Sequence, residues 1–366
     1  MLVLSAFMMI LMFVLLAFAV DLGQMVVSGT ELQRTADAAA IAATWDLIDE
    51  DAVRGYDNSA TLADEARATA DQYAGVNHVL QEGPSLAQED VTIGYLANPS
   101  DPTEELSVDG LDAPNVVRVR VRRAEAQNGL VPMSFARVLG IDGAANQAEA
   151  TAAVLTNFGC IGSPGGTGNA QVLPFALDQQ TFQDLLAGAG TDNWTFNEET
   201  GQVTGGPDGV NEVNLFPQGT GSPGNRGTVD IGAPNNSTAD LARQIVDGVT
   251  PEDLEYVGGS LELDENGELE LNGDTGISAG MKDELESIKG QPRIIPIFSQ
   301  VAGNGNNAQY TIVNFTGIRV MEVKLTGPMS SKRVIIQPAN IVVRGGIPSS
   351  GPKVSWFIYS PVWLVR

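Results

Sequence analysis

The chain begins with an uninterrupted apolar run, MLVLSAFMMILMFVLLAFAV, in which Ser5 is the only polar side chain and no residue is charged. A helix of this length spans about 30 Å, the thickness of the hydrocarbon core of a bilayer. Backbone groups in lipid must pair within their own segment, which requires a helix. The apolar character resumes after Asp21. We therefore predict a transmembrane helix over residues 1–27.

A cleaved signal peptide is the alternative, because Ala17-Phe18-Ala19 fits a small-x-small cleavage site. However, no Lys or Arg precedes Arg34, and the apolar run is longer than that of a normal signal peptide. We expect a retained single-pass anchor, with the lipid bilayer as the partner of residues 1–27; the family resemblance described below implies that this membrane is the bacterial inner membrane. The rest of the chain is acidic and has no other apolar run of this length, so we expect its bulk outside the cytoplasm.

The helical pattern continues beyond the membrane segment as a stripe of small residues. Residues 21–48 contain no Pro and are rich in Ala, the best helix former. Apolar residues recur at spacings of three and four, which predicts one narrow apolar face. These positions are Leu22, Met25, Val26, Leu32, Ala36, Ala39, Ala40 and Ala43. We expect a rod that lies against a globular domain or against neighbouring copies, because small side chains permit close approach.

A set of residues in this region resembles the N-terminal motif of TadG-like proteins of the Flp (tight adherence, type IVb) pilus-assembly system. The motif follows an N-terminal membrane helix and combines D-x-G, then L-Q, then A-D-A-A-A. The matching residues are Asp21, Gly23, Leu32, Gln33, Ala36, Asp37, Ala38, Ala39 and Ala40. Thr35 and Ile41 depart from the family pattern, which has Ala and Leu there. A looser similarity runs through Val117–Val121 and Val131–Gly140, so the match covers about residues 1–155.

The resemblance implies a membrane-anchored component of pilus assembly or adhesion, structural rather than catalytic, located outside the cytoplasm. It also implies contacts with other pilus-assembly proteins, for which we expect the Ala-rich helix to be used. Some family members carry a von Willebrand A domain with an Asp-x-Ser-x-Ser metal motif, but this chain lacks that triplet. Position 5 is Ser rather than the Glu of processed pilins, which argues against packing as a pilus subunit.

The segment that follows predicts a small α+β unit, so that residues 28–156 form one domain with the rod. Helical spacing of Ala predicts a helix over Thr61–Val79, near whose end the single histidine, His78, is more plausibly a surface residue than a catalyst. Alternation predicts strands, most clearly where Val and Arg alternate. The expected strands are Val91–Leu96, Val116–Arg122 and residues 147–156, with a short helix over residues 134–140.

A Gly-rich break suggests a linker over residues 157–170 and a second, extracytoplasmic domain over residues 171–366. Cys160 lies in the break. It is either an incidental thiol or the site of an intermolecular disulfide or another modification.

The middle of the second domain is acidic and rich in turns. We expect helices over Thr238–Val249, with Thr238 as N-cap, and over Ser278–Lys289. Alternating Leu residues around Asn266-Gly267 predict a hairpin from Leu261 to Leu271. Its acids are a candidate calcium site, although their spacing is not that of an EF-hand and alternation alone explains them as a solvated strand face. These acids are Glu262, Asp264, Glu265, Glu268, Glu270 and Asp274.

Strand patterns dominate the end of the chain. The expected strands are Arg293–Phe298, Tyr310–Phe315, Ile318–Leu325, Arg333–Ile336, Ile341–Arg344 and Val354–Val365. Residues 293–366 hold eight Lys and Arg but a single acid, Glu322. We expect this basic tail to pack against the acidic middle or to meet an acidic partner. The fold class is therefore α+β: a long membrane helix, a small α+β unit and a strand-rich C-terminal domain.

Composition narrows the function further. The chain holds 45 Asp and Glu against 20 Lys and Arg, which argues against nucleic acid as a partner because phosphate binding needs a basic face. One Cys and one His leave no Cys-rich or multi-His metal site. No catalytic, cofactor-binding or metal residue stands out, and no small-molecule substrate is evident. An envelope hydrolase using paired carboxylates, or a calcium-binding surface adhesin, is the alternative to a structural role.

Overall fold

The computed structural model describes residues 2–55, 59–99, 101, 103–108, 114–215, 227–233, 236–274, 279–303, 305–328, 331–349 and 352–365. The chain divides into two compact units. The N-terminal unit consists of Met1–Asp49, Ser59–Val154 and Val362–Arg366, and the C-terminal unit consists of Glu50–Asn58 and Leu155–Pro361. Both mix helices and strands, and the second is rich in strands, which confirms the predicted α+β class.

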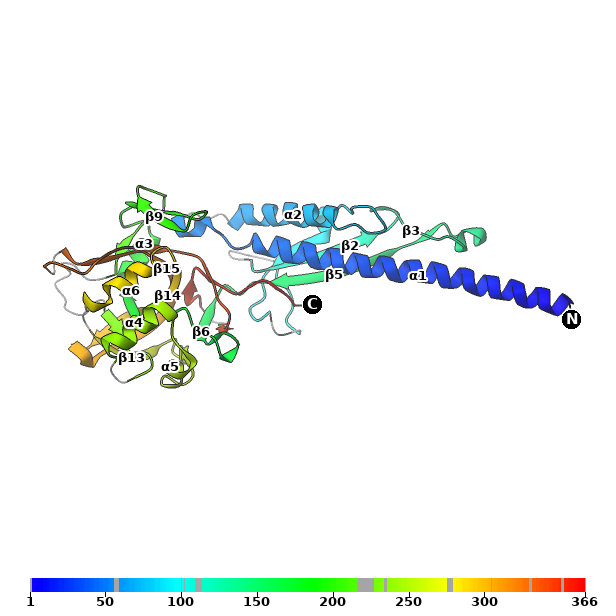
Figure 1. The fold of residues 1–366 in the computed structure, drawn as a ribbon. Coiled ribbons are helices and arrows are strands. Elements are labelled where there is room, and N and C mark those ends of the chain that lie inside the picture. The colour runs from blue at the N-terminus through cyan, green and yellow to red at the C-terminus, as the bar shows by residue number, and fades with distance from the viewer. Residues whose placement is uncertain are drawn as a thin grey trace. The chain divides into compact units, whose positions relative to one another are not determined.

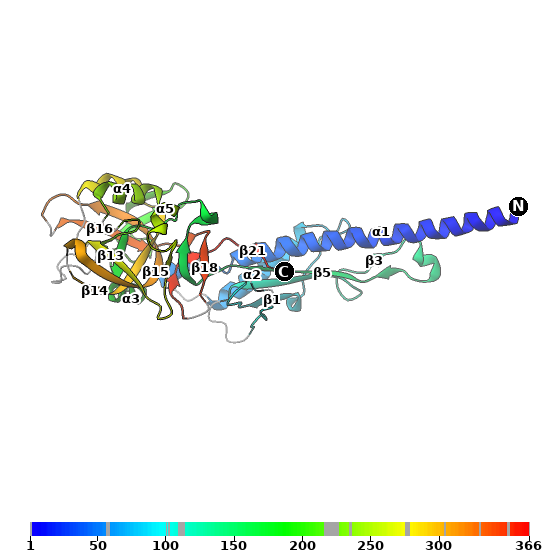
Figure 2. The ribbon, with the colours of Figure 1, turned by 90° about the horizontal axis from the view of Figure 1, so that it is seen from below.

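The N-terminal unit is organised around one long helix, α1 (Leu2–Trp45), which Figures 1 and 2 show in blue. Within the described part of the chain, α1 is the one helix that is long and apolar enough to cross a membrane. Its large apolar side chains from Leu4 to Phe18 are mostly exposed, as expected of a surface whose partner is lipid. The helix therefore joins the predicted membrane segment to the predicted rod without a break.

A four-stranded antiparallel sheet packs against the C-terminal half of α1 and against the second helix, α2 (Ser59–Val76). The strand order is β1-β2-β5-β21. Their bounds are β1 Val91–Gly94, β2 Val116–Arg123, β5 Asn146–Ala153 and β21 Trp363–Leu364. The helix and three strands predicted for this unit are thus present, with shifted ends, and the last residues of the chain complete the sheet.

The alternation along β2 separates two faces of this sheet. Val117, Val119 and Val121 are fully buried in the core that the sheet forms with the two helices. On the other face, Arg120 and Arg122 hold the carboxylate of Asp90, each with a nitrogen 3.0 Å from Oδ1. Asp90 ends the short 3-10 helix η2 (Gln88–Asp90) and is almost fully buried. One face is therefore closed by apolar packing and the other by an ion-pair network.

Beyond the sheet, a narrow ribbon continues toward the N-terminal end of α1. It consists of β3 (Val131–Pro132), paired with β4 (Gly143–Ala144), and the 3-10 helix η3 (Ala136–Leu139) between them. The prediction of a short helix over residues 134–140 is thus correct in place, but the helix has four residues and 3-10 geometry. Gly140, with φ +85°, ends it in the left-handed conformation that favours glycine.

The C-terminal unit is built on a sheet that closes on itself. Strands β15, β13, β11, β7 and β14 pair in that order, and β14 pairs again with β15. Strands β16, β10 and β19 extend the sheet. Their bounds are β7 Phe175–Asp178, β10 Val213–Asn214, β11 Gly227–Val229, β13 Leu269–Asp274, β14 Pro292–Ala302, β15 Ala308–Lys324, β16 Arg333–Pro338 and β19 Ser355–Trp356. The strands of the basic tail thus pair with a strand of the acidic middle.

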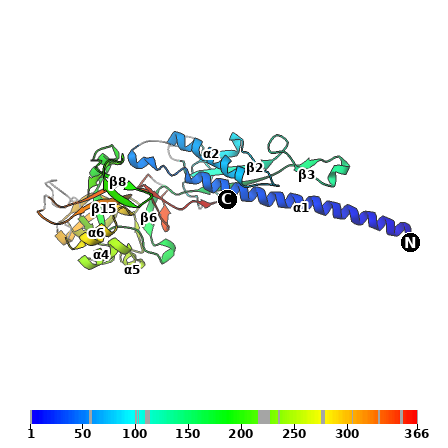
Figure 3. The same ribbon diagram turned by 45° about the horizontal axis from the view of Figure 1, so that its top comes forward.

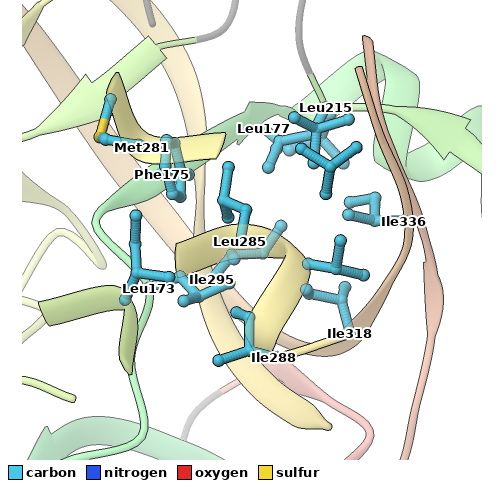
Figure 4. Close-up of a cluster of buried hydrophobic side chains, with 14 of the residues drawn as sticks. Leu173, Phe175, Leu177, Leu215, Met281, Leu285, Ile288, Ile295, Ile318 and Ile336 are labelled. Carbon is cyan, nitrogen blue, oxygen red and sulfur yellow. The ribbon is translucent and has the colours of Figure 1, made fainter. Parts of the chain in front are cut away.

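Helices cover this sheet and contribute Phe182, Leu241, Ile245, Met281 and Leu285 to its core, to which the strands contribute more residues (Figure 4). Leu285 projects from its short helix into a cluster of Leu, Ile and Phe side chains from the strands. The Ser237 hydroxyl, rather than Thr238, caps α4 by accepting a hydrogen bond from the Asp240 amide. The helices are α3 Gln179–Leu186, α4 Thr238–Asp247, α5 Pro251–Glu255 and α6 Lys282–Ser287, with 3-10 turns η1 Asp51–Arg54, η4 Pro164–Gly166, η5 Ala279–Met281 and η6 Gly305–Asn307.

Three smaller sheets complete the unit. Strand β6 pairs with both β12 and β18, β17 pairs with β20, and β8 pairs with β9. Their bounds are β6 Phe158–Gly162, β8 Trp194–Asn197, β9 Gln202–Gly205, β12 Ser260–Glu262, β17 Ile341–Val342, β18 Gly346–Pro348 and β20 Ile358–Tyr359. The interpretation of residues 157–170 as a linker is therefore wrong, because β6 is paired on both edges and Phe158 is buried.

Two predicted strand arrangements are also wrong. The hairpin from Leu261 to Leu271 does not form, because β12 pairs with β6 whereas β13 pairs with β11 and β15. The turn still forms: the Asp264 carboxylate accepts hydrogen bonds from the amides of Asn266 and Glu268, and the Asp264 amide donates to the Glu268 carbonyl. The predicted strand Val354–Val365 is broken into β19, β20 and β21; Phe357, with φ +58°, separates β19 from β20, and Pro361 lies between β20 and β21.

Candidate functional site

The first residue of the family motif, Asp21, connects α1 to the ribbon. Its Oδ1 accepts hydrogen bonds from the amides of Ser134 (2.7 Å) and Phe135 (3.1 Å), and its Oδ2 accepts from Phe135 (3.1 Å) and Ala136 (2.7 Å). The carboxylate is buried. It therefore satisfies the free amides at the start of η3, the task that an N-cap side chain performs in an ordinary helix.

The segment that Asp21 holds is apolar and exposed. We call Met133–Asp142 the tip segment. Val138 and Leu139 are 86% and 83% exposed, and Phe135 and Ile141 are about half exposed. Figures 1 and 3 show the ribbon that carries this segment beside α1. An exposed apolar cluster of this kind marks a surface that meets another apolar phase or partner.

A groove of about 660 Å³ lies between the tip segment and α1. Its walls are apolar on both sides, and its lining includes Ile10, Phe13, Val14, Ala17, Phe135, Val138 and Leu139. Asp21 lies at the groove as well, with its oxygens already used by the backbone amides. The chemistry of this groove suits hydrocarbon rather than a polar substrate.

The Ala stripe of the motif is covered by the chain itself. Leu32, Ala36, Ala39 and Ala40 are fully buried in the core shared with α2 and the sheet, and Ala38 is partly exposed beside them. The buried side chains of this stripe are therefore not available to other pilus-assembly proteins, and the expected contact through the Ala-rich helix stays a prediction for its exposed faces. Their small size instead lets α1 approach its own sheet closely.

Polar residues of the motif tie α1 to the rest of the unit. Gln33 Nε2 donates to Asp37 Oδ1 (2.8 Å) and to the carbonyl of Glu149 on β5 (3.1 Å). Glu31 accepts a hydrogen bond from the amide of Leu80, which follows α2. These contacts fix the orientation of α1 about its own axis, so the same face always meets the sheet.

Gly23, unlike the motif residues described above, makes no contact that explains why this residue type is present. A Cβ added there would meet no atom within 4 Å, so crowding by this chain does not account for the glycine. Nothing else in the structure explains it.

Two residues that the sequence interpretation missed also hold the junction between α1 and the ribbon. Asn146, at the start of β5, donates from Nδ2 to the Met25 carbonyl (3.1 Å) and to Ser28 Oγ (2.8 Å). Ser28 is fully buried. The contacts join residues more than 110 positions apart, so no local pattern could have indicated them.

The acids proposed for calcium binding do not gather. Within the described residues, no three Asp, Glu, His or Cys side chains come together in a way that could hold a metal ion. Asp264 is used by its own turn, and Glu270 Oε1 accepts a hydrogen bond from Thr311 (2.6 Å). Neither the groove at Asp21 nor a hollow of about 270 Å³ in the C-terminal unit is lined by two carboxylates.

Neither the single Cys nor the single His lines the groove at Asp21. Cys160 is buried in β6, and burial raises the pKa of its thiol, with the Glu262 carboxylate adding to the effect. A thiol in that environment is a poor nucleophile, which disfavours the intermolecular disulfide. His78 is exposed after the end of α2, and its carbonyl accepts a hydrogen bond from Arg34.

Comparison with known families assigns the N-terminal part of the chain. Residues 1–53 match the model of a Flp pilus-assembly TadE/G-like family, and residues 42–152 match that of a Tad-like Flp pilus-assembly family. The resemblance drawn from the motif is thereby confirmed over this region. No curated protein and no solved structure matches the chain.

Proposed function

We propose that this chain, whose residues 1–152 belong to a TadG-like Flp pilus-assembly family, is a membrane-anchored structural component of a Flp pilus-assembly or adhesion machine. The observation that carries the proposal is the continuity of α1. One helix supplies an apolar, exposed N-terminal half and a C-terminal half built into a rigid α+β unit. The same helix thus links a segment suited to the membrane directly to a folded domain.

The chemistry available at the site supports a structural role. The groove beside α1 is apolar, and its carboxylate serves three backbone amides. Catalysis by paired carboxylates needs two acids that face a substrate space. The features described above favour neither the hydrolase nor the calcium-binding adhesin.

We also propose that both folded units lie outside the cytoplasm and that α1 crosses the inner membrane once. The proposal rests on the single apolar helix and on the acidity of the rest of the chain. Protease added to intact spheroplasts should degrade both units and leave a short membrane fragment. Protection of both units until the membrane is permeabilised would reverse the proposed orientation.

Contacts with other pilus-assembly proteins must use surfaces other than the buried Ala stripe. Co-purification from detergent-solubilised membranes is the direct way to find them. We expect Ala38→Leu, on the edge of the stripe, to leave the set of co-purifying proteins unchanged. Loss of partners in that variant would restore the Ala-rich helix as an interface.

The function itself is tested by deletion. A strain that lacks this chain should lose surface Flp pili and attachment, and the wild-type gene should restore both. A second strain should carry a variant with Leu11→Arg and Leu15→Arg, which places two charges in the apolar half of α1, where each costs roughly 3 kcal/mol. We expect it to fail in the same way, with the protein lost from the membrane fraction. Normal pili in the deletion strain would refute the proposal.

A further inference from the structure

We infer that the tip segment (Met133–Asp142) enters the same bilayer as α1 and contacts acyl chains of the leaflet nearest the folded unit. The protein would then have a second lipid contact that does not span the membrane. The inference rests on the proposed membrane anchor and deepens it, because it states what occupies the groove between α1 and η3.

The first argument is the position of the tip segment along α1, which sets its depth in a bilayer that the apolar run would span. The groove is lined by residues of α1 from Ile10 to Phe18, together with Phe135, Val138 and Leu139. At 1.5 Å per residue, these positions of α1 lie about 5 to 16 Å along the helix from Asp21, on the side of the apolar run. If that run occupies a hydrocarbon core about 30 Å thick, the tip segment beside it lies within the same layer.

The second argument is the surface that the tip segment presents. Val138 and Leu139 are among the most exposed apolar side chains of the chain, and Ile141 is half exposed beside them. Exposing such residues to water is unfavourable, by an amount roughly proportional to their area. Exposing them to lipid removes this cost. The continuity of the cluster with the apolar half of α1 identifies hydrocarbon as its partner.

The third argument is the pairing of backbone groups. Irregular backbone enters a membrane only when its polar groups are satisfied. Asp21 accepts the hydrogen bonds of Ser134, Phe135 and Ala136. Four more amides donate to carbonyls within the segment: Met133 N to Asp142 O, Val138 N to Phe135 O, Gly140 N to Arg137 O and Ile141 N to Ala136 O, all between 3.0 and 3.2 Å. These backbone amides of the tip segment therefore need no water as a hydrogen-bond partner.

Its charged side chains fit the membrane interface. Arg137 Nε lies 3.1 Å from Asp142 Oδ1, and both side chains are largely exposed. A paired, flexible Arg can extend from an apolar layer to the headgroups while its methylene stem stays in hydrocarbon. The pair therefore limits how deep the tip segment goes and is compatible with its insertion.

The experiment places an environment-sensitive fluorophore at single cysteines in the full chain. The background is Cys160→Ser, and the reporter is Val138→Cys labelled with a nitrobenzoxadiazole group. The labelled protein is reconstituted in vesicles of phosphatidylethanolamine and phosphatidylglycerol that contain lipids brominated on their acyl chains. We expect blue-shifted emission at position 138 and loss of emission to the brominated lipids, and the same for Leu139→Cys.

Two control positions make the outcome decisive. Leu11→Cys reports on the apolar half of α1 and should be quenched. Val76→Cys, 69% exposed at the end of α2, should not be quenched. The neighbouring Asn77 carbonyl accepts a hydrogen bond from Thr35, which lies about 21 Å along α1 beyond Asp21. Quenching at 11 without quenching at 138 and 139 overturns the inference and leaves the anchor intact. Absence of quenching at 11 as well overturns both.

Discussion

The two units of this protein build their cores from different side chains. Nine of the 17 buried residues in the N-terminal core are Ala, whereas none of the 19 described residues in the C-terminal core is Ala. The first core joins two helices closely to a sheet, and the second fills the space between a closed sheet and short helices with Leu, Ile and Phe. The helix that carries the apolar N-terminal half is thus held to its sheet by close backbone approach rather than by large side chains.

The units also differ in how they bury a carboxylate. Asp90 of the N-terminal unit is held by two arginines of β2. Asp230 of the C-terminal unit accepts hydrogen bonds from the Asn236 amide and from Asn272 Nδ2. Burial raises the pKa of Asp230, and the nearby Asp274 carboxylate raises it further. The family matches end at residue 152. They therefore cover the N-terminal unit, which has the Ala-rich core and the carboxylate paired with arginines.

The largest effect should come from the C-terminal core. Leu285→Ala removes a fully buried side chain at the centre of the cluster in Figure 4. We expect the free energy of unfolding to fall by about 3 to 4 kcal/mol, because the cavity adds to the lost transfer energy. Denaturant unfolding in detergent, with Trp45 and Trp363 replaced by Phe, leaves Trp194 and Trp356 as reporters of this unit.

A matched truncation on the surface serves as control for this measurement. Val246→Ala on α4, where the side chain is 44% exposed, should change the free energy of unfolding by less than about 0.5 kcal/mol. Equal losses in the two variants would mean that the cluster around Leu285 does not carry the stability of this unit.

The next effect tests the ion-paired carboxylate. Asp90→Ala leaves two arginines of β2 without their buried partner, and we expect a loss of about 3 kcal/mol in the N-terminal unit. The reporters are Trp45 and Trp363, with Trp194 and Trp356 replaced by Phe. The control is Asp64→Ala, because the Asp64 side chain is 85% exposed and its pair with Arg67 is worth roughly 0 to 1 kcal/mol. A small effect of Asp90→Ala would show that the network is not structural.

Close packing of α1 gives a third, smaller effect. Ala39→Leu adds three carbons at a fully buried position, and we expect a loss of about 2 kcal/mol from overpacking. Ala38→Leu makes the same change at the neighbouring, partly exposed position. Its effect on unfolding, read from Trp45 and Trp363, should be much smaller. Comparable losses would contradict the conclusion that one stripe of alanines sets the distance between α1 and its sheet.

The sequence predicts the N-terminal unit better than the C-terminal unit for a physical reason. Its helices and strands are one-sided, so the spacing of Ala in α1 and the alternation along β2 indicate both the element and its buried face. In the C-terminal unit the pairings are non-local. The turn at Asn266-Gly267 has the right residues for a hairpin, yet each flanking strand finds a partner elsewhere in the chain.

The contacts of the candidate site are also non-local, so the sequence does not predict them. The sequence indicates Asp21 only as part of a motif, since its partners at residues 134–136 lie more than 110 positions away. The same sequence predicts an ordinary short helix where the exposed apolar tip segment lies. Its exposure depends on the ribbon that carries it past the sheet, which the sequence pattern does not reveal.

The last and smallest effect uses the second buried carboxylate. Because the pKa of Asp230 is raised in the folded state above its ordinary value of 3.8, the folded chain holds this proton more tightly than the unfolded chain. Its contribution to stability is fully present below pH 3.8 and is lost as the pH rises through the raised, folded-state pKa. Asp230→Asn cannot titrate. The free energy of unfolding of the wild type, minus that of the variant, should therefore fall as the pH rises through this window and then level off. Unfolding followed by Trp194 and Trp356 over a pH series measures this difference. A difference that stays constant with pH would mean that Asp230 is not held in a protonation-sensitive environment, and a difference that rises would mean that it is stabilised as an anion, as a carboxylate held by arginines is.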